Sequence, residues 1–361
     1  MALVLNRDNN AQWIDRTDIL TKIPANNFVL GNLGIFEDHY SSLKLIEIVR
    51  NNKNQGLLKD KNWDEKHQTV VSGDREYMQL KIPHFPASDS ILPQDIDGVV
   101  AVNNMQEAMG LESVAAVRLE KMTTLVDSHS LTKEAARMQL ITDGTVYAPN
   151  GTLRTSYGDT VNFYTEFGIT RTEAAIDFLG TMDPRKDIEA QRKAVINGLN
   201  GTASFGAVRV VALCGSDYFD ALVANPYVID AVKYQQFNQS EPLLVGRPDE
   251  GAYGLSGIYR SITIFGVTFL DVGMAGYYTS AGTLVPFMGA KEARFLPVGA
   301  RGVFKTYYAP AQRFGTINRQ AQGSYFFEYA NEKDDIIEIY SEQNFLNAML
   351  YPAAVTRSYI S

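Results

Sequence analysis

The chain has 361 residues, enough for about two domains of ordinary size with a substantial buried core. Its 33 Lys and Arg residues are outnumbered by 41 Asp and Glu, for a net charge of −8 at pH 7, so we expect no sequence-specific nucleic-acid binding, which uses a basic face. The chain has a single cysteine, Cys214, which excludes an internal disulfide, and no Cys or His cluster has the spacing of a zinc site. Because the chain has no run of about eighteen apolar residues, we expect no membrane span.

Residues 1–36 mix short apolar groups with Asn, Pro and Gly and have no sustained helical or strand periodicity, so we expect an extended arm. Two β-prone segments follow, at 43–50 and 77–82, and they are typical of the two strands of a hairpin. About twenty-five residues separate them, whereas an ordinary hairpin loop has about two to five. A long two-stranded projection is marginally stable alone in water, so the pattern indicates that something else packs against it.

The segment between the two strands, 51–75, alternates Lys and Arg with Asp and Glu and holds a few apolar side chains. It admits two interpretations, a solvated loop or a docking arm that sets the register on a neighbouring subunit, since charges of alternating sign give specificity more than affinity. Under the second interpretation, the candidate contact residues are Leu57, Leu58, Lys59, Trp63 and Arg75. The length of the loop favours the docking arm.

A long helix is predicted next, from about Asn104 to Ile141, which corresponds to roughly 55 Å. Asn104 can cap it, with Glu107 at the third helical position of a capping box. Gly110 and residues 127–132 are places where the helix could kink or break. The expected inward stripe consists of Leu111, Ala115, Leu119, Met122, Leu125 and Val126.

Three short strands are expected after this helix, at 145–148, 153–155 and 161–164. Asn150-Gly151 supplies a turn between the first two. A second helix begins at Asp183-Pro184, with Asp at the cap and Pro at the first helical position, and ends near Asn197-Gly198. Its expected inward stripe consists of Ile188, Gln191, Val195 and Leu199.

The segment from Val208 to Leu213 is a buried strand by composition, and Gly215-Ser216-Asp217 turns it into a helix. Asn225-Pro226 ends that helix and begins another. Further strands are expected at 261–270, 293–296, 336–340 and 353–360. Helices and strands are mixed without a regular βαβ repeat, so the predicted fold class is α+β.

The turn Cys214-Gly215-Ser216-Asp217 comes nearest to a catalytic motif, because a strand-to-helix turn can hold a nucleophile. It lacks the Gly-x-Ser-x-Gly of the serine-hydrolase elbow, and no Walker lysine follows a Gly-rich loop. Ser216 or Asp217 as a helix cap and Cys214 as a small buried hydrophobe explain the turn. The four histidines are scattered along the chain: His39, His67, His84 and His129. We therefore predict no catalytic, cofactor or metal site.

Three stretches carry a family resemblance: Leu80-Lys-Ile-Pro-His-Phe-Pro86, Ala212-Leu-Cys-Gly-Ser-Asp-Tyr-Phe-Asp-Ala-Leu222 and Glu292-Ala-Arg-Phe-Leu-Pro-Val-Gly299. Residues 162–168 lie between the first two, and 304–310 follow the third. In order and spacing these segments resemble the lambda-type major capsid proteins, the phage capsid protein E family, which have the Hong Kong 97 fold. The resemblance extends over most of the chain from about Phe28 onward.

The resemblance implies a role for each part of the chain. A long hairpin called the E-loop would lie across an adjacent subunit, and the long helix, at about 104–141, would be the spine helix of a peripheral domain. The implied parts are an N-terminal arm at 1–36, the E-loop at 37–90, the peripheral domain at 91–182, an axial domain at 183–296 and returning strands of the peripheral domain at 297–361.

The resemblance also implies partners. Hexamers and pentamers of one chain would form an icosahedral shell around packaged DNA, without a cofactor or a covalent crosslink, and with scaffold and portal proteins and optional decoration proteins as partners. The chain would be made in the host cytoplasm and reside in the virion head. Two alternatives stay open at this point: an encapsulin-like nanocompartment shell protein, and a cytosolic α+β enzyme whose site the sequence does not reveal.

Overall fold

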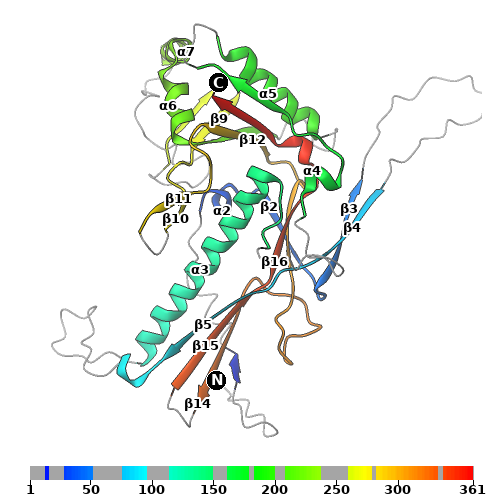
Figure 1. Ribbon diagram of the computed structural model, residues 1–361, viewed down its shortest axis with the longest axis vertical. Coiled ribbons are helices and arrows are strands. Elements are labelled where there is room, and N and C mark those ends of the chain that lie inside the picture. The colour runs from blue at the N-terminus through cyan, green and yellow to red at the C-terminus, as the bar shows by residue number, and fades with distance from the viewer. Residues whose placement is uncertain are drawn as a thin grey trace, which may run out of the picture.

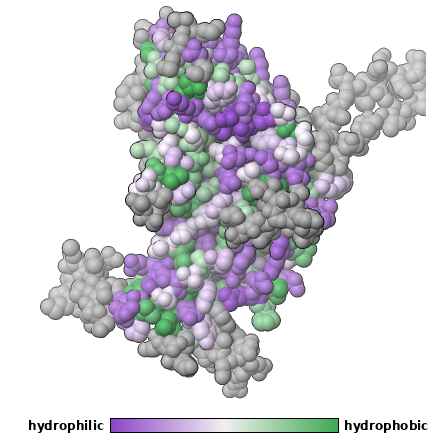
Figure 2. Space-filling model, viewed as in Figure 1, coloured by the Kyte–Doolittle hydropathy of each residue, from purple (hydrophilic) through white to green (hydrophobic). Residues whose placement is uncertain are grey.

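A computed structural model describes residues 13–15, 28–51, 75–95, 114–148, 161–178, 183–199, 208–236, 259–278, 282–331 and 336–360. The molecule is elongated, with a helix-covered sheet at one end, a second sheet at the other, and one long helix running between them (Figure 1). Hydrophilic residues cover most of the face shown in Figure 2, and hydrophobic residues reach it in separate small patches. No helix in the part of the chain that the structure describes is long and apolar enough to span a membrane.

A six-stranded mixed sheet forms the upper end in Figure 1, with strand order β6-β17-β12-β7-β9-β8. Its strands are β6 (Glu173–Ile176), β17 (Thr356–Ile360), β12 (Glu292–Val298), β7 (Arg209–Cys214), β9 (Val267–Asp271) and β8 (Ser261–Ile264). Three helices accompany it: α5 (Arg185–Gly198), α6 (Ser216–Ala224) and α7 (Pro226–Gln236). The final strand β17 pairs with β12 and β6, so the end of the chain lies in the sheet built mainly by residues 183–296.

Local sequence explains the centre of this sheet. The predicted buried strand is confirmed as β7, whose residues from Val210 to Cys214 are at most 3% exposed. The predicted strand region 261–270 is confirmed as the hairpin β8–β9. Its two-residue turn places Phe265 at φ 51° and Gly266 at φ 73°, the paired left-handed geometry of a type I′ hairpin.

Helix α5 follows its prediction except at its start, where Pro184 and not Asp183 occupies the cap position and the helix begins at Arg185. The Asp183 carboxylate accepts a hydrogen bond of 3.0 Å from the backbone N–H of Arg185, which satisfies one of the free donors at the helix start. The predicted inward stripe is confirmed, with exposures of 0 to 2%: Ile188, Gln191, Val195 and Leu199. Gly198 faces the short helix η2 (Pro352–Ala354), where an added Cβ would lie 2.2 Å from the carbonyl oxygen of Ala353.

The lower half contains the long helix α3 (Val114–Asp143) and two further sheets. The four-stranded sheet consists of β1 (Trp13–Asp15), β14 (Tyr325–Asn331), β15 (Ile336–Gln343) and β5 (Phe85–Ile91). The three-stranded sheet consists of β16 (Phe345–Met349), β13 (Phe304–Tyr308) and β2 (Phe36–Tyr40). Helix α2 (Val29–Leu33) packs on α3, and η1 (Pro93–Asp95) follows β5.

Three expectations about this half need correction or fall outside the structure. Helix α3 runs without a break through residues 127–132, and the predicted cap at Asn104 lies outside the described residues. Ala115 and Leu119, predicted to face inward, are exposed. Met122, Leu125 and Val126 of the predicted stripe are buried as expected. Met122 and Leu125 pack with Val117 on the four-stranded sheet, and Leu119 lies two positions, or about 200° of rotation, from Val117.

The expected strand at 161–164 is wrong. These residues lead into the single-turn helix α4 (Phe163–Glu166), because the side chain of Asn162 accepts a hydrogen bond of 2.9 Å from the N–H of Tyr164 and caps it. The expected strand at 145–148 is reduced to one bridge between Thr145 and Asn162. The strand expected at 153–155 and the Asn150-Gly151 turn lie outside the part that the structure describes.

Candidate functional site

The predicted hairpin is confirmed as a two-stranded ribbon that projects from the body (Figure 1). Strand β3 (Leu45–Asn51) pairs antiparallel with β4 (Arg75–Lys81), and Ile46 lies opposite Leu80. On its inner face, Ile46, Ile48 and Leu80 are 7%, 1% and 0% exposed and belong to the main hydrophobic core. The root of the ribbon is therefore fixed to its own subunit.

The outer face of the ribbon carries exposed apolar side chains among polar ones, since Glu47, Gln79 and Lys81 share that face. Leu45, Val49 and Tyr77 are 43%, 38% and 59% exposed, and Val49 lies directly opposite Tyr77. Leu43, just before β3, is 61% exposed. An antiparallel sheet with one buried face ordinarily presents polar side chains on the other, so exposed apolar side chains here make this face a candidate contact surface.

Of the predicted contact residues, Leu57, Leu58, Lys59 and Trp63 lie outside the described residues. Arg75 is the first residue of β4 and lies opposite Asn51 in the register. The outer-face residues Leu45, Val49 and Tyr77 were not among the predicted contact residues. The signal for them was the run Leu45-Ile46-Glu47-Ile48-Val49, in which apolar residues occupy both faces of one strand.

The described parts of the N-terminal arm lie on the body of their own subunit. Strand β1 pairs antiparallel with β14, whereas residues 29–33 of the predicted extended arm form helix α2. Strand β2 begins at Phe36, at the end of the predicted arm, and pairs in parallel with β13. The backbone N–H of Leu30 in α2 donates a hydrogen bond of 2.7 Å to the carboxylate of Glu134 on α3. Burial raises the pKa of this carboxyl group.

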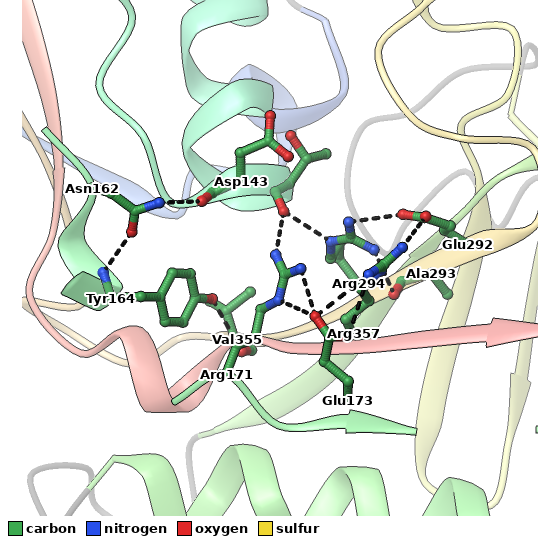
Figure 3. Close-up of polar contacts among 11 residues, drawn as sticks. Asp143, Asn162, Tyr164, Arg171, Glu173, Glu292, Ala293, Arg294, Val355 and Arg357 are labelled. Atoms are coloured by element: carbon green, nitrogen blue, oxygen red, sulfur yellow. Dashed lines mark hydrogen bonds and ion pairs between the residues drawn. The ribbon is translucent and has the colours of Figure 1, made fainter. Parts of the chain in front are cut away.

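An arginine network joins the end of α3 to the six-stranded sheet (Figure 3). The carbonyl oxygen of Thr142 accepts hydrogen bonds from Arg171 at 2.5 Å and from Arg294 at 3.3 Å. Two carboxylates balance the guanidinium groups. Glu173 binds Arg171 at 2.7 Å and Arg357 at 3.3 Å, and Glu292 binds Arg294 at 2.8 Å and also contacts Arg357.

The charges in this network suit its position. The carbonyl end of a helix carries a partial negative charge, which the guanidinium groups of Arg171 and Arg294 stabilise. Burial lowers the pKa of Arg294, which is 3% exposed, although its ion pair with Glu292 opposes that effect. Burial raises the pKa of Glu292, but hydrogen bonds from Arg357 and Arg294 outweigh it, so the pKa is below its ordinary value. The network locks the helix to the sheet.

The turn at Cys214 has no catalytic geometry. Cys214 is fully buried, and burial raises the pKa of its thiol. The predicted capping role of Ser216 or Asp217 is wrong, because Gly215 occupies the cap position of α6 and no side chain caps it. The hydroxyl of Ser216 lies 3.5 Å from Asp271, whose other carboxylate oxygen is held by Arg260 at 2.6 and 2.9 Å. These contacts fix the loop after β9.

Two hollows border α3. One of about 550 Å³ lies between α3 and the hairpin of β10 (Gly276–Tyr278) and β11 (Leu284–Pro286), and one of about 360 Å³ lies beside His84 and His129. His84 is held by Asn344 at 2.6 Å, and burial lowers the pKa of His129 to about 4. Within the described ranges, no group of three or more His, Cys, Asp or Glu could hold a metal ion.

Comparisons with known proteins agree on one family. The model of a family described as phage major capsid protein E matches residues 17–358. The major capsid protein of Pseudomonas phage KPP10 is 31% identical over 352 residues, 97% of each chain, and that of Salmonella phage Felix O1 is 24% identical over 344 residues, 90% of this chain and 89% of that one. A solved structure of the capsid protein assigned to a prophage of E. coli CFT073 shares the fold, with a TM-score of 0.52 at 12% identity over 80% of both chains.

Proposed function

Since this chain belongs to the phage major capsid protein E family, we propose that its copies assemble as hexamers and pentamers into the icosahedral shell of a tailed-phage head. The shell-forming role and the α+β Hong Kong 97-like fold come with the family. The observation that carries the proposal is the 31% identity to the KPP10 major capsid protein along 97% of both chains. A relation of that extent concerns the whole protein and not one shared domain.

The ribbon supports this role physically. Its inner face is anchored in the core of one subunit, while Leu45, Val49 and Tyr77 present apolar surface outward. An outer face of this kind gains free energy when a second subunit removes it from water. The segment 51–75 joins the two strands of the ribbon in sequence, so its candidate residues Leu57, Leu58, Lys59, Trp63 and Arg75 would extend the contact onto that neighbour.

Several finer features belong to the proposal. The division into an N-terminal arm, E-loop, peripheral domain and axial domain applies as the sequence suggests, except that strands β6 and β17 join the sheet of the axial part. Scaffold and portal proteins, with optional decoration proteins, are the further partners, and synthesis occurs in the host cytoplasm. The net charge of −8 suits a shell that encloses DNA without binding it tightly, since a cationic lining would hold phosphates.

We also propose that the chain performs no catalysis. The arginine network and the buried Cys214 turn are explained by structural roles, and neither requires a substrate. Of the two alternatives, the encapsulin-like shell protein is disfavoured because both relatives described above are phage major capsid proteins. The enzyme alternative is disfavoured by the same family membership.

Assembly of the purified chain tests the proposal. Light scattering and negative-stain microscopy are expected to find capsomers or closed shells. Tyr77→Ser should reduce the yield of shells at least tenfold with little change in melting temperature, because Tyr77 is 59% exposed in the isolated subunit. Tyr278→Ser, at an equally accessible tyrosine on β10 that is 72% exposed, is the matched control. A compact monomer at every salt concentration would contradict the proposal.

A further inference from the structure

A buried histidine lies in the middle of α3, between two separate clusters of packed side chains. Before it, Met122 and Leu125 pack on the four-stranded sheet. After it, Leu140 and Ile141 join the main core, which also holds the inner face of the ribbon. His129 belongs to neither cluster and is 6% exposed. Its side chain therefore occupies the joint between the sheet and the core that carries the ribbon.

His129 borders a cavity of about 360 Å³. The opposite wall is the connection from the ribbon to the sheet, which runs from the end of β4 into β5, the strand that lies beside α3 (Figure 1). Two contacts hold this wall in place. The Nδ1 atom of His84 donates to the amide oxygen of Asn344 at 2.6 Å, and the ring of Phe85 stacks on Phe345 at 4.8 Å between centroids. The wall is thus attached to the strands, and only packing holds it on α3.

One nitrogen of the His129 ring has no polar partner. The Nε2 atom is buried and accepts or donates no hydrogen bond among the described residues. Two hydroxyl groups border the same cavity, but those of Ser128 and Thr132 donate to backbone carbonyls of α3 at 2.9 and 2.8 Å. A buried polar atom without a partner costs free energy, so its presence at a joint calls for a functional explanation.

The cavity offers no anion to a protonated ring. The described residues that line it include no Asp or Glu, and their titratable members besides His129 are His84 and Tyr147. On α3 itself, Asp127 lies about 200° around the helix, and Lys133 lies about one turn further on. A proton on His129 would therefore place a second positive charge near Lys133, with no carboxylate in the cavity to balance it.

The other elements that pack on α3 do not supply this anion either. Asp89 of β5 binds Lys121 at 3.6 Å, about two helical turns before His129. Both glutamates of β15, Glu338 and Glu342, lie on the face of the sheet that points away from α3, because the alternate residues of that strand pack on the helix. Helix α2 and strand β16 contain no charged residue. Within the described ranges, the ring is uncharged only at the cost of staying dry.

Burial without a compensating charge lowers the pKa of His129 to about 4, against an ordinary value of 6.5. The ring is therefore neutral at pH 7 while the cavity is closed. When the wall separates from α3, water reaches the ring and its pKa rises towards the ordinary value. The open form thus binds more protons between these two pH values, so a falling pH favours it.

We propose that His129 makes the joint between the four-stranded sheet and the ribbon-bearing core sensitive to protons: an uncharged ring keeps residues 83–87 on α3, and a charged ring separates them and lets the sheet move relative to the ribbon. The consequence for assembly rests on the proposed shell-forming function. Subunits whose two parts move against each other lose conformational entropy when they enter a shell, so acid should weaken assembly.

Hydrogen exchange followed by mass spectrometry tests the joint in the purified chain. Exchange of residues 83–91 is measured from pH 7 to about pH 4 and divided by the exchange of the unfolded chain at the same pH, with α5 as the internal reference. This ratio is expected to rise by more than about tenfold in the wild type. It should stay constant in His129→Gln, because glutamine takes up no proton.

Two further variants complete the exchange experiment. His129→Met, with an uncharged side chain of similar size, takes the place of His129→Gln if that variant does not fold. His39→Gln is the matched control, at a histidine whose side chain is 44% exposed and does not line the cavity, and it should respond to acid as the wild type does. An unchanged ratio in the wild type, or an equal rise in His129→Gln, would overturn the proposal.

Shell assembly tests the consequence separately. The yield of wild-type shells should fall at least about tenfold over the same pH range, whereas His129→Gln should keep most of its yield. Equal losses in both chains would overturn the link between the joint and assembly. A wild-type chain that forms no shell at pH 7 would instead refute the proposed function, and the exchange of residues 83–91 would still decide whether the joint responds to protons.

Discussion

The arginine network at the end of α3 gives a quantitative prediction. Glu292→Gln removes the carboxylate that binds both Arg294 and Arg357. Arg357 keeps Glu173, whereas the buried Arg294 loses its carboxylate partner in the network. Arg294→Met removes the most deeply buried cation instead, and leaves Arg171 bound to the carbonyl of Thr142. The two variants therefore differ in whether an uncompensated charge stays buried.

The expected magnitudes follow from burial. Breaking a buried pair by removing one partner costs about 3–5 kcal/mol, and because the Glu292 side chain is 26% exposed we expect about 2–3 kcal/mol for Glu292→Gln. Arg294→Met removes the buried cation itself and leaves the partly exposed Glu292 paired with Arg357, so no unpaired charge stays buried and the cost should be smaller than for Glu292→Gln. Glu292→Gln is therefore expected to lower the free energy of unfolding more than Arg294→Met does.

Urea denaturation followed by circular dichroism measures both costs as shifts in the transition midpoint at constant slope. The folded pKa of Glu292 is lowered, so its contribution is present above the ordinary value of 4.5 and is lost as the pH falls through the folded pKa. The difference between wild type and Glu292→Gln should therefore shrink in acid. A larger loss for Arg294→Met than for Glu292→Gln at pH 7 would refute the reasoning.

Three further predictions concern stability. The pKa of His129 is about 4 in the folded chain against an ordinary 6.5, so the unfolded chain binds more protons between these two pH values. The free energy of unfolding should therefore fall by roughly 3 kcal/mol as the pH drops from 6.5 to 4. Melting curves of His129→Gln should lack this pH dependence. Leu80→Ala should lower the free energy of unfolding in urea by about 2–5 kcal/mol, because Leu80 is fully buried. Leu43→Ala, at a position 61% exposed, should change it by no more than about 0.5 kcal/mol. Equal effects would contradict the assignment of an inner and an outer face to the ribbon. Gly215→Ala should lower the melting temperature, because the added Cβ would lie 2.2 Å from a backbone carbonyl oxygen of the loop before β12, and an unchanged value would be inconsistent with that close approach.

Features set by neighbouring residues could be predicted from the sequence. The start of α5 could be predicted to within one residue, because Asp183-Pro184 precedes it and the Asp183 carboxylate accepts a hydrogen bond from the N–H of Arg185. Strand β7 was readable because five consecutive small or branched apolar residues have no polar face to expose. The short helix α4 was missed because a β-prone tripeptide competes with the cap supplied by Asn162, and the cap prevails.

Features set by long-range packing could not be predicted in the same way. Helix α3 carries apolar residues on two faces, and the position of the four-stranded sheet decides that Met122 is buried and Leu119 is bare. The candidate site was predicted in its location but not in its residues. The hairpin was evident from two β-prone segments, whereas the exposure of Val49 and Tyr77 depends on which face of the ribbon the core occupies.

We infer that this chain functions through contacts with other copies of itself in a closed shell and not through a catalytic pocket. Cryo-electron microscopy of the assembled particle tests it most directly. We expect a closed shell in which Val49 and Tyr77, both exposed in the isolated subunit, are buried against a neighbouring copy. A closed shell that leaves both side chains in solvent, or particles that never close, would contradict the account.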